Sequence, residues 1–487
     1  MAHNVFYGDE SPIAAFATPA GGGALTLIRC SGKGSIKMVS SVFEPAGKKK
    51  DALDTAQGNT VVHGWIIADN NEKIDEVLIS VFRSPKSYTG EDSLDICCHG
   101  GYCAGNAVIA ALKTTGFRDA LPGEFTFRAF MNGKIDLTKS ESIMELVSSK
   151  TDTGRSRAVS RLSGSLQKEI NEIKEKLVHI LAGAELYLDY SEDEISTDAD
   201  EAAGRLPNID TAVDVLTRLK KLSASWQTER IYQEGITCVI TGRPNAGKSS
   251  LFNSLLREDR SIVTEFPGTT RDWIEAWVSF NGIPVRLIDT AGLREANDTA
   301  EKIGVERSRL LLQEADIVLY LIDGEEGFTS EDHEEFKKFE ERKNNICDNT
   351  IKKNVFLFLW NKCDIAKPPA VFPLTGISPV YISAKTGGGL AGLQSEITSV
   401  IFQTAGWNAE CIDKSAAPSI GSIRQKNLVD AAYFSLDEAL SLAERNEPLD
   451  LIAPLLRDAV NSLGEITGEV STSDILEEMF SKFCVGK

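Results

Sequence analysis

A segment near the middle of the chain constrains the fold more than any other. The apolar run ITCVIT, residues 236–241, leads directly into GRPNAGKSS, residues 242–250. The second run fits the pattern G-x-x-x-x-G-K-[ST], in which a strand passes through a glycine-rich loop into a helix. Backbone N–H groups of such a loop turn inward around a phosphate, and the positive end of the helix faces its charge. The segment therefore predicts an α/β domain that binds nucleotide phosphates.

Side chains of this loop and of a later strand have predicted roles. Lys248 is expected to reach the β- and γ-phosphates, and the Ser249 hydroxyl is expected to bind Mg²⁺. A strand, turn and helix that share these glycines by chance are the alternative. Further along, VRLIDTAG, residues 285–292, ends a strand pattern with Asp-x-x-Gly. There Asp289 suits a carboxylate that supports the Mg²⁺ site, and Gly292 suits a backbone donor to the γ-phosphate.

The identity of the base is predicted from the segment FLFLWNKCD, residues 356–364. This strand pattern delivers Asn361, Lys362 and Asp364 to a loop. The three residues resemble the N-K-x-D motif of GTPases, in which the aspartate accepts two hydrogens from the edge of guanine. Adenine has an acceptor at the ring position that matters, so the carboxylate would face another acceptor. The segment therefore favours GTP over ATP.

A last strand and loop, YISAK at residues 381–385, would complete the base pocket. Four motifs in this order, each at the C-terminal end of a strand, predict a GTPase and exclude the chance alternative. The predicted nucleotide-binding residues are Asn245, Ala246, Gly247, Lys248, Ser249, Ser250, Thr264, Thr269, Thr270, Asp289, Gly292, Asn361, Lys362, Asp364, Ser383 and Ala384.

The switch regions indicate which kind of GTPase this is. PGTTRD contains Thr269 and Thr270 in the expected first switch, and one of them, assigned as Thr270, can close on Mg²⁺. After DTAG comes Leu293, where Ras-like proteins carry a glutamine that orients the attacking water. An apolar side chain cannot hold the nucleophile, so another group or ion must. Asn245 and Glu301 are the nearest polar candidates, although Glu301 alone reads as an ordinary acid at a helix N-terminus.

Composition limits the class of protein, its partners and its compartment. Of the 487 residues, 42% are hydrophobic and 25% are charged, which suits a folded chain of three or four domains. The net charge of −19 disfavours non-specific polyanion binding, so any nucleic-acid contact must be local and specific. No uninterrupted apolar stretch approaches the roughly 18 residues of a membrane span. The nine cysteines suit a reducing cytosol. We therefore expect a cytoplasmic protein without a signal peptide or a membrane span.

The pattern along the chain predicts the fold class. Strands are expected at residues 13–17, 24–28, 60–67, 75–82 and 93–98, with a helix at 103–115. Long helical periodicity follows at 166–188 and returns after 403. The predicted domains are an N-terminal α/β domain at 1–120, a helical domain at 121–228 and 403–487, and a P-loop domain at 229–402. The fold class is thus multidomain α/β plus all-α, with the P-loop domain inserted into a helical bundle.

Two further clusters suggest a site but are interpreted otherwise. The run CCHGGYC, residues 97–103, has the side chains of a zinc site in Cys97, Cys98, His99 and Cys103. Adjacent strand residues point to opposite faces, so the first two cannot easily share one metal, and buried strand cysteines are favoured. A dense basic cluster is formed by Arg155, Arg157 and Arg161. These arginines could touch an RNA backbone, but a solvated helix face is favoured.

Several blocks together resemble a single family. They are GRPNAGKSSLFNSL, PGTTRD and DTAGLRE, the terminal FCVGK, and the blocks at 17–32, 87–101 and 122–142. Over nearly the whole chain they resemble the MnmE (TrmE) family of tRNA-modification GTPases. Other GTPases share the P-loop motifs, so the N-terminal blocks and the tail are the specific part. The resemblance implies an N-terminal α/β domain that binds folate and dimerises, a helical bundle, and a Ras-like P-loop GTPase domain inserted into the bundle.

The resemblance also implies a mechanism of GTP hydrolysis. Hydrolysis in the family is stimulated by K⁺ and by pairing of G domains across a homodimer. Asn245 matches the K⁺ ligand of the family, with Thr264, Phe266 and Thr269 at the positions of its K⁺ loop. Glu301 aligns with the catalytic glutamate. A monovalent cation held there supplies positive charge where an arginine finger would otherwise act. In the family this cation makes up for the missing glutamine of the second switch.

A folate site is implied in the N-terminal part and the tail. Arg29, Asp95, Lys134 and Lys487 fall on the binding positions of the family. A carboxylate suits the ring N–H groups of a pteridine, and cations suit its glutamate tail. The family usually has glutamate where this chain has Asp95, which is one methylene shorter. The family tail places Cys484 beside the folate as a catalytic residue, although a terminal cysteine taken alone is more often incidental.

The function implied by the family requires partners. A protein of this family works with MnmG, an FAD- and NADH-dependent protein, in a heterotetramer or larger assembly. Together they install an aminomethyl or carboxymethylaminomethyl group at C5 of the tRNA wobble uridine. The carbon comes from 5-formyl- or 5,10-methylene-tetrahydrofolate, and GTP hydrolysis drives domain rearrangement.

The alternative is an Era/Der-like regulatory or ribosome-assembly GTPase that binds RNA without modifying it. Such proteins need a basic appendage, whereas residues 403–487 hold 7 basic and 14 acidic residues. A standalone folate aminomethyl transferase would leave the GTP motifs unused.

Overall fold

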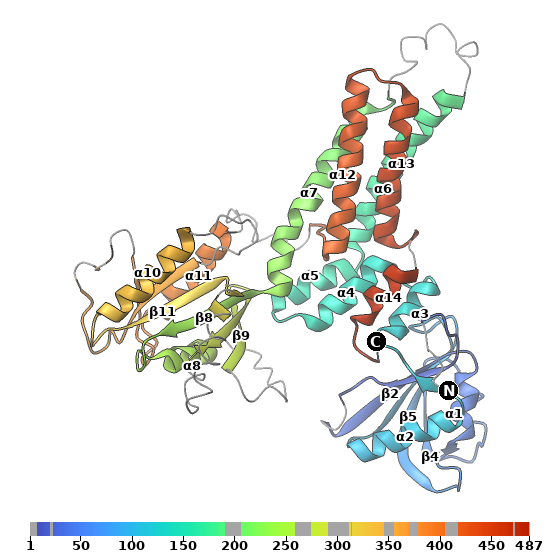
Figure 1. Cartoon of the computed structure of the whole chain (residues 1–487). Coiled ribbons are helices and arrows are strands. Elements are labelled where there is room, and N and C mark those ends of the chain that lie inside the picture. The colour runs from blue at the N-terminus through green and yellow to red at the C-terminus, as the bar shows by residue number, and fades with distance from the viewer. Residues whose placement is uncertain are drawn as a thin grey trace. The chain divides into compact units, whose positions relative to one another are not determined.

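The computed structural model, shown in Figure 1, describes most of the chain in several stretches. The described residues are 7–19, 23–189, 206–258, 274–290, 311–312, 314–344, 355–369, 372, 374, 378–404, 417–470 and 473–486. The chain forms two compact units. The first unit comprises residues 1–144, 167–216 and 431–487, and the second comprises residues 145–166 and 217–430.

The first unit contains a seven-stranded sheet covered by helices α1 (Ser35–Ser41) and α2 (Tyr102–Thr114). Its strands are β1 (Ile13–Phe16), β2 (Leu25–Ser31), β3 (Phe43–Pro45), β4 (Thr60–Ile67), β5 (Lys73–Phe82), β6 (Ser93–His99) and β7 (Arg118–Asp119). Their order is β3-β4-β5-β6-β2-β1-β7, and only β1 and β7 pair in parallel. The five predicted strands and the predicted helix are confirmed, whereas β3 and β7 were not expected.

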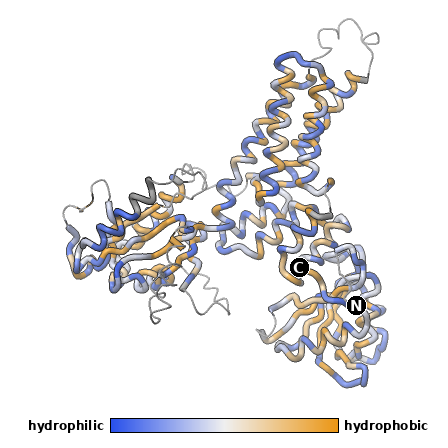
Figure 2. The backbone as a smooth tube through the Cα atoms, viewed as in Figure 1, coloured by the Kyte–Doolittle hydropathy of each residue, from blue (hydrophilic) through white to orange (hydrophobic). Residues whose placement is uncertain are grey.

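Strand β6 shows how this sheet separates an inner face from an outer one. Leu94, Ile96 and Cys98 are buried in the core of the sheet, while Asp95 and Cys97 between them are only half-buried. This alternation has the period of two that a strand dictates. Cys97 and Cys98 therefore lie on opposite faces, as expected. Figure 2 shows apolar residues running along the strands of both sheets in the chain.

Among the described residues, seven further helices belong wholly or in part to the first unit, and the division between the units falls within some of them. They are α3 (Glu124–Met131), α4 (Leu137–Ser148), α6 (Ser165–Asp189), α7 (Ile209–Glu234), α12 (Ile423–Glu444), α13 (Leu449–Thr467) and α14 (Ser473–Ser481). The helical periodicity predicted at 166–188 is thus confirmed by α6. Within the first unit, ion pairs fasten α13 and the turn after it to α6, through Arg457 with Glu185 and Glu469 with Lys174.

The second unit contains a six-stranded sheet in the order β13-β12-β11-β8-β10-β9. The strands are β8 (Ile236–Gly242), β9 (Ile274–Phe280), β10 (Ile283–Asp289), β11 (Ile317–Asp323), β12 (Val355–Asn361) and β13 (Val380–Tyr381), and only β9 is antiparallel. Every residue of β11 is buried, as expected for an inner strand of a parallel sheet covered on both faces. The strand predicted directly before the glycine-rich loop is confirmed as β8.

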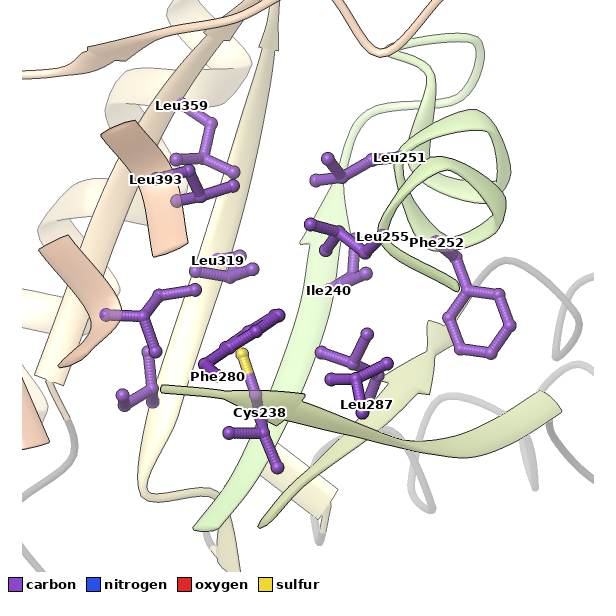
Figure 3. Packing of buried hydrophobic residues seen from close by; sticks show 14 of the residues in the cluster. Cys238, Ile240, Leu251, Phe252, Leu255, Phe280, Leu287, Leu319, Leu359 and Leu393 are labelled. Atoms are coloured by element: carbon purple, nitrogen blue, oxygen red, sulfur yellow. The ribbon is translucent and has the colours of Figure 1, made fainter. Parts of the chain in front are cut away.

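Helices cover both faces of this second sheet. Helices α8 (Lys248–Glu258) and α11 (Leu390–Thr404) pack on one face, where Leu251, Leu255 and Leu393 meet Leu319 and Phe280 of the strands, as Figure 3 shows. Helix α10 (Ser330–Asn344) covers the other face through Phe336, which packs against Tyr320 and Phe358. The sheet and its helices agree with the α/β fold that the glycine-rich loop predicted for this part of the chain.

One interpretation from the sequence is wrong. Arg157 and Arg161 of helix α5 (Asp152–Leu162) do not form a solvated face, because both side chains are buried in the second unit. Glu229 of α7 pairs with both arginines, and Glu145 of α4 pairs with Arg161. These carboxylates compensate the charges, which makes burial possible. Arg155 of the same helix is exposed, as expected.

No helix within the described ranges is both long and apolar enough to traverse a bilayer.

Candidate functional site

The predicted nucleotide motifs meet at one edge of the second sheet. Strands β8, β10, β11 and β12 run parallel and end at Gly242, Asp289, Asp323 and Asn361. The carboxyl ends of parallel strands form the crevice in which α/β proteins bind ligands. The sheet topology therefore brings together motifs that lie more than a hundred residues apart in the sequence.

The glycine-rich loop starts from a close backbone approach between β8 and β11. Gly242 has a φ of 141°, and a Cβ atom there would lie 2.5 Å from the carbonyl oxygen of Leu321. Only glycine fits this position. Further along the loop, Asn245 takes a φ of 61° and is exposed, and α8 begins at Lys248. This is the strand–loop–helix arrangement that cradles phosphates.

The Lys248 amine is held by the loop itself. Its side chain is buried, and Nζ donates to the carbonyl oxygens of Gly242 at 3.1 Å and of Arg243 at 2.8 Å. Both acceptors are backbone groups of the loop that would surround the phosphates. The amine therefore lies inside the loop, ready to exchange a carbonyl for a phosphate oxygen.

Oxygen atoms that could bind a divalent cation lie next to this loop. The Ser249 hydroxyl at the start of α8 donates to Oδ2 of Asp289 at 2.8 Å, and Asp289 is fully buried at the end of β10. The neighbouring Thr290 hydroxyl donates to the Ile240 carbonyl oxygen at 2.9 Å, which fixes the end of β10 to β8. A hydroxyl beside a carboxylate is the hard-oxygen donor set that suits Mg²⁺. The residues present therefore fit the predicted cation.

Asn361 joins the phosphate loop to the predicted base pocket. Its side chain is buried, its Nδ2 donates to the Ala246 carbonyl oxygen at 2.8 Å, and its Oδ1 accepts from the Ala384 N–H at 2.9 Å. One side chain therefore fixes both loops. An amide suits this first position of the N-K-x-D motif, since its nitrogen donates to one loop while its oxygen accepts from the other.

The Asp364 carboxylate, which is predicted to read guanine, lies beside the last loop. The Ser383 hydroxyl donates to Oδ1 of Asp364 at 2.7 Å, and this hydrogen bond lowers the pKa of the Asp364 carboxyl below its ordinary value. The group stays charged and keeps its second oxygen available to accept. Lys362 of the same motif pairs with Asp323 at 2.6 Å and Glu325 at 2.8 Å, and these contacts raise the pKa of its amine.

Sequence reasoning missed the residues that brace this edge. Arg243 is the second residue of the glycine-rich loop, and its guanidinium contacts Asp332, Glu326 and the Gly327 carbonyl oxygen. Lys362 is held by Asp323, the last residue of β11, and by Glu325, which lies in the same connection between β11 and α10. Only the charge of Arg243 at a variable position of the motif could have drawn attention to it.

In the first unit, two predicted folate residues are brought together. Arg29 on β2 and Asp95 on β6 lie opposite each other on neighbouring strands, and Nε of Arg29 donates to Oδ1 of Asp95 at 3.0 Å. The guanidinium also lies over the Tyr88 ring, 5.7 Å from its centroid. Sequence reasoning missed Tyr88, whose hydroxyl lies 2.9 Å from that of Thr126. Lys134 instead donates to the Pro85 carbonyl oxygen at 2.9 Å, at the start of the loop that carries Tyr88.

The C-terminal tail docks within the first unit. Phe480 and Phe483 are buried in a cluster with Phe127, and the Cys484 carbonyl oxygen accepts from the Gly123 N–H at 3.2 Å. Cys484 itself is an exposed free thiol. The apolar end of α14 therefore fixes the backbone of the tail and leaves the thiol accessible.

The remaining predicted residues are Ser250 and a group that lies outside the described ranges. Ser250 is exposed in the first turn of α8. Those outside the described residues are Thr264, Phe266, Thr269, Thr270, Gly292, Glu301 and Lys487. Their assignments as switch, K⁺, catalytic and folate residues therefore stay predictions.

Comparison with known proteins identifies the family. The family models of the MnmE helical domain and of the GTP-binding protein TrmE N-terminus match residues 137–484 and 12–134. The tRNA modification GTPase MnmE of Treponema denticola is 41% identical and aligns over 99% of each chain. The protein of that name from Carboxydothermus hydrogenoformans is 40% identical over 98% of this chain and 100% of its own. That from Acetivibrio thermocellus is 37% identical over 98% and 99%. The chain therefore belongs to the MnmE family.

Proposed function

We propose that this chain, a tRNA modification GTPase by its family, hydrolyses GTP with the help of K⁺ and uses a folate carbon to modify the tRNA wobble uridine. The product is the 5-aminomethyl or 5-carboxymethylaminomethyl derivative, made together with an FAD-dependent partner of the MnmG kind. The single observation that carries the nucleotide part is the bridge from Ala246 through Asn361 to Ala384. Through this bridge, the single side chain of Asn361 connects the phosphate loop to the base loop.

The phosphate loop supports hydrolysis assisted by cations. Ser249 and Asp289 would hold Mg²⁺, and the exposed amide of Asn245 at the outer turn of the loop would offer K⁺ an oxygen. Bound there, the cations would supply positive charge to the phosphates. Lys248, Ser249 and the loop N–H groups orient the nucleotide, while Thr264, Phe266, Thr269, Thr270 and Glu301 are proposed to complete the site.

The first unit supports a folate site near the tail. Arg29 and Asp95 form a half-exposed pair, with the Tyr88 ring packed on the guanidinium. A pteridine can share the carboxylate of this pair through its N–H groups, and an aromatic ring beside it offers a stacking surface. Lys134 and Lys487 are proposed to hold the acid end of the ligand. The exposed thiol of Cys484 is proposed to act next to it, on a tail that Gly123 fixes.

We further propose a homodimer with paired G domains and a heterotetramer or larger assembly with the flavoprotein. The proposed G domain is residues 229–402, inserted between the helical segments 121–228 and 403–487, after an N-terminal domain at 1–120. Seven described cysteines are free thiols, which supports a reducing compartment such as the cytoplasm. An Era/Der-like regulatory role is not favoured by membership of the family.

The cation mechanism is tested by GTP hydrolysis in matched K⁺ and Na⁺ buffers. Hydrolysis is expected to be at least about 10-fold faster in K⁺, because a cation near the phosphates stabilises the charge of the transition state. Asn245→Ala should remove most of this advantage. Asn253→Ala, a change of the same type on the exposed side of α8, should retain it. Equal rates of the unaltered protein in both salts would refute the cation mechanism.

The folate part has its own test. Equilibrium dialysis should show binding of 5-formyl-tetrahydrofolate to the full chain. Asp95→Asn removes the charge that faces Arg29 and should weaken binding, whereas Asp119→Asn in the exposed pair with Lys113 should not. No binding by the unaltered chain would contradict the folate proposal and favour the regulatory alternative.

A further inference from the structure

The phosphate loop carries an arginine whose contacts reach a different part of the second unit. Arg243 donates through Nε to Asp332 at 3.1 Å, through Nη1 to Glu326 at 2.5 Å, and through Nη2 to the Gly327 carbonyl oxygen at 3.0 Å. All three acceptors belong to the connection between β11 and α10 or to the first turn of α10. The guanidinium therefore uses every one of its nitrogens to fasten the loop to one segment.

Asp332, which accepts from Nε of Arg243, is also held in place by other donors. Asp332 is fully buried and accepts from the Tyr320 hydroxyl at 2.8 Å and from the N–H and hydroxyl of Thr329, both at 2.9 Å. Burial, and then the hydrogen bond to Asp332, raises the pKa of Tyr320, so its hydroxyl stays protonated and donates. A carboxylate taken out of water in this way requires a cationic partner. Arg243 supplies that charge.

The backbone of the same arginine contacts the phosphate-binding amine. The Arg243 carbonyl oxygen accepts from Nζ of Lys248 at 2.8 Å. The side chain of Arg243 thus fixes a residue whose main chain holds Lys248. At the far end of the loop, Asn361 holds the Ala246 carbonyl oxygen. The loop is therefore fastened at both ends, and the second anchor was visible in the N-K-x-D motif whereas the first was not.

We propose that Arg243 is a positioning residue for GTP hydrolysis, which acts through Asp332 to set the conformation of the phosphate loop and the place of Lys248. This inference rests on the proposed binding of GTP to that loop. Arg243 itself touches no phosphate in this role. Its effect is on orientation, where an error of about 1 Å costs on the order of 100-fold in rate.

The test compares kcat and KM for GTP, and the Kd of a fluorescent GDP, between the full chain and its variants. Arg243→Ala and Asp332→Asn are each expected to lower kcat/KM by about 10-fold to 100-fold. The double variant should lose little more than either single one, because both remove the same contact. Arg286→Gln, which breaks an ion pair with Glu275 between strands β10 and β9 of the same sheet, is the matched control and should leave these constants unchanged.

Milder variants keep the proposal testable if these do not fold. Arg243→Lys retains the charge but cannot reach Asp332, Glu326 and the Gly327 carbonyl oxygen together. Tyr320→Phe removes one donor from Asp332 without touching the loop. Both should stay folded and lower kcat/KM several-fold. Wild-type kinetic and binding constants in folded variants, with only the melting temperature reduced, would overturn the proposal. Failure of the unaltered chain to bind fluorescent GDP would instead refute the proposed function itself.

Discussion

Arg161 and Glu229 form an ion pair of 2.8 Å in which the side chains are 2% and 1% exposed. The same arginine pairs with Glu145 at 2.6 Å and donates to the Ser419 hydroxyl at 3.0 Å. Glu229 lies on α7, just before the strand that carries the phosphate loop, and Ser419 lies on the segment that precedes α12. The segments before and after the nucleotide-binding sheet are thus fastened to one buried arginine.

Replacing this arginine should destabilise the second unit. Arg161→Met removes a cation that pairs with the buried carboxylates of Glu145 and Glu229, which costs about 3–5 kcal/mol. Urea unfolding followed by tryptophan fluorescence measures this change. Arg155→Met, on the exposed side of the same helix, should cost no more than about 0.5 kcal/mol. Equal losses of unfolding free energy in the two variants would show that the buried ion pairs of Arg161 stabilise the unit no more than an exposed arginine does.

Asn361→Ala should weaken nucleotide binding. The change removes the contacts to the Ala246 carbonyl oxygen and the Ala384 N–H, each worth about 1 kcal/mol. Affinity for GDP should therefore fall by at least about 10-fold. Calorimetric titration measures it, with Asn253→Ala as the control on the surface of α8. Unchanged affinity would mean that the two loops hold their positions without the bridge.

Gly486→Ala should separate GTP hydrolysis from tRNA modification. Gly486 has a φ of 92°, and a Cβ atom there would lie 2.2 Å from the Phe16 carbonyl oxygen. The tail must shift, and Cys484 shifts with it. We expect modification to be lost while hydrolysis is retained. Gly392→Ala, where a Cβ atom meets nothing within 4 Å, should retain both activities. Normal modification by the Gly486 variant would remove the tail from the proposed chemistry.

The first unit should lose stability at high pH through Tyr7. Burial, and then the nearby charges of Glu124 and Glu477, raise its pKa to about 12, while the unfolded chain titrates near its ordinary value of about 10. The unfolded state therefore releases the proton first, and stability falls as the pH rises from about 10 through about 12. Tyr7→Phe should make this decline shallower in melting temperatures measured between pH 9 and about 11.5. An identical slope in both proteins would assign the decline to other groups.

Much of the fold could be predicted because it rests on local patterns. The strand at 60–67 is recovered residue for residue as β4, since alternation of side chains identifies a strand without knowledge of its partners. The phosphate loop and the Asn361 motif were equally visible, because their chemistry requires particular residues at fixed spacing. Strand β3 was missed because three residues carry too little periodicity.

The rest depends on contacts between distant residues. Arg161 and Glu229 are 68 positions apart, and Arg243 and Asp332 are 89 apart. Nothing in the neighbourhood of an arginine in the sequence tells whether a carboxylate will meet it after folding. Arg157 and Arg161 were therefore interpreted as a solvated surface, and the role of Arg243 was not foreseen at all.

The central claim is that the carboxyl edge of the second sheet selects guanine nucleotides. Displacement of fluorescent GDP by unlabelled nucleotides tests it most directly. GDP and GTP should displace the probe, whereas ADP and ATP at the same concentrations should not, because Asp364 would face an acceptor on adenine. Equal displacement by ATP and GTP would contradict the claim.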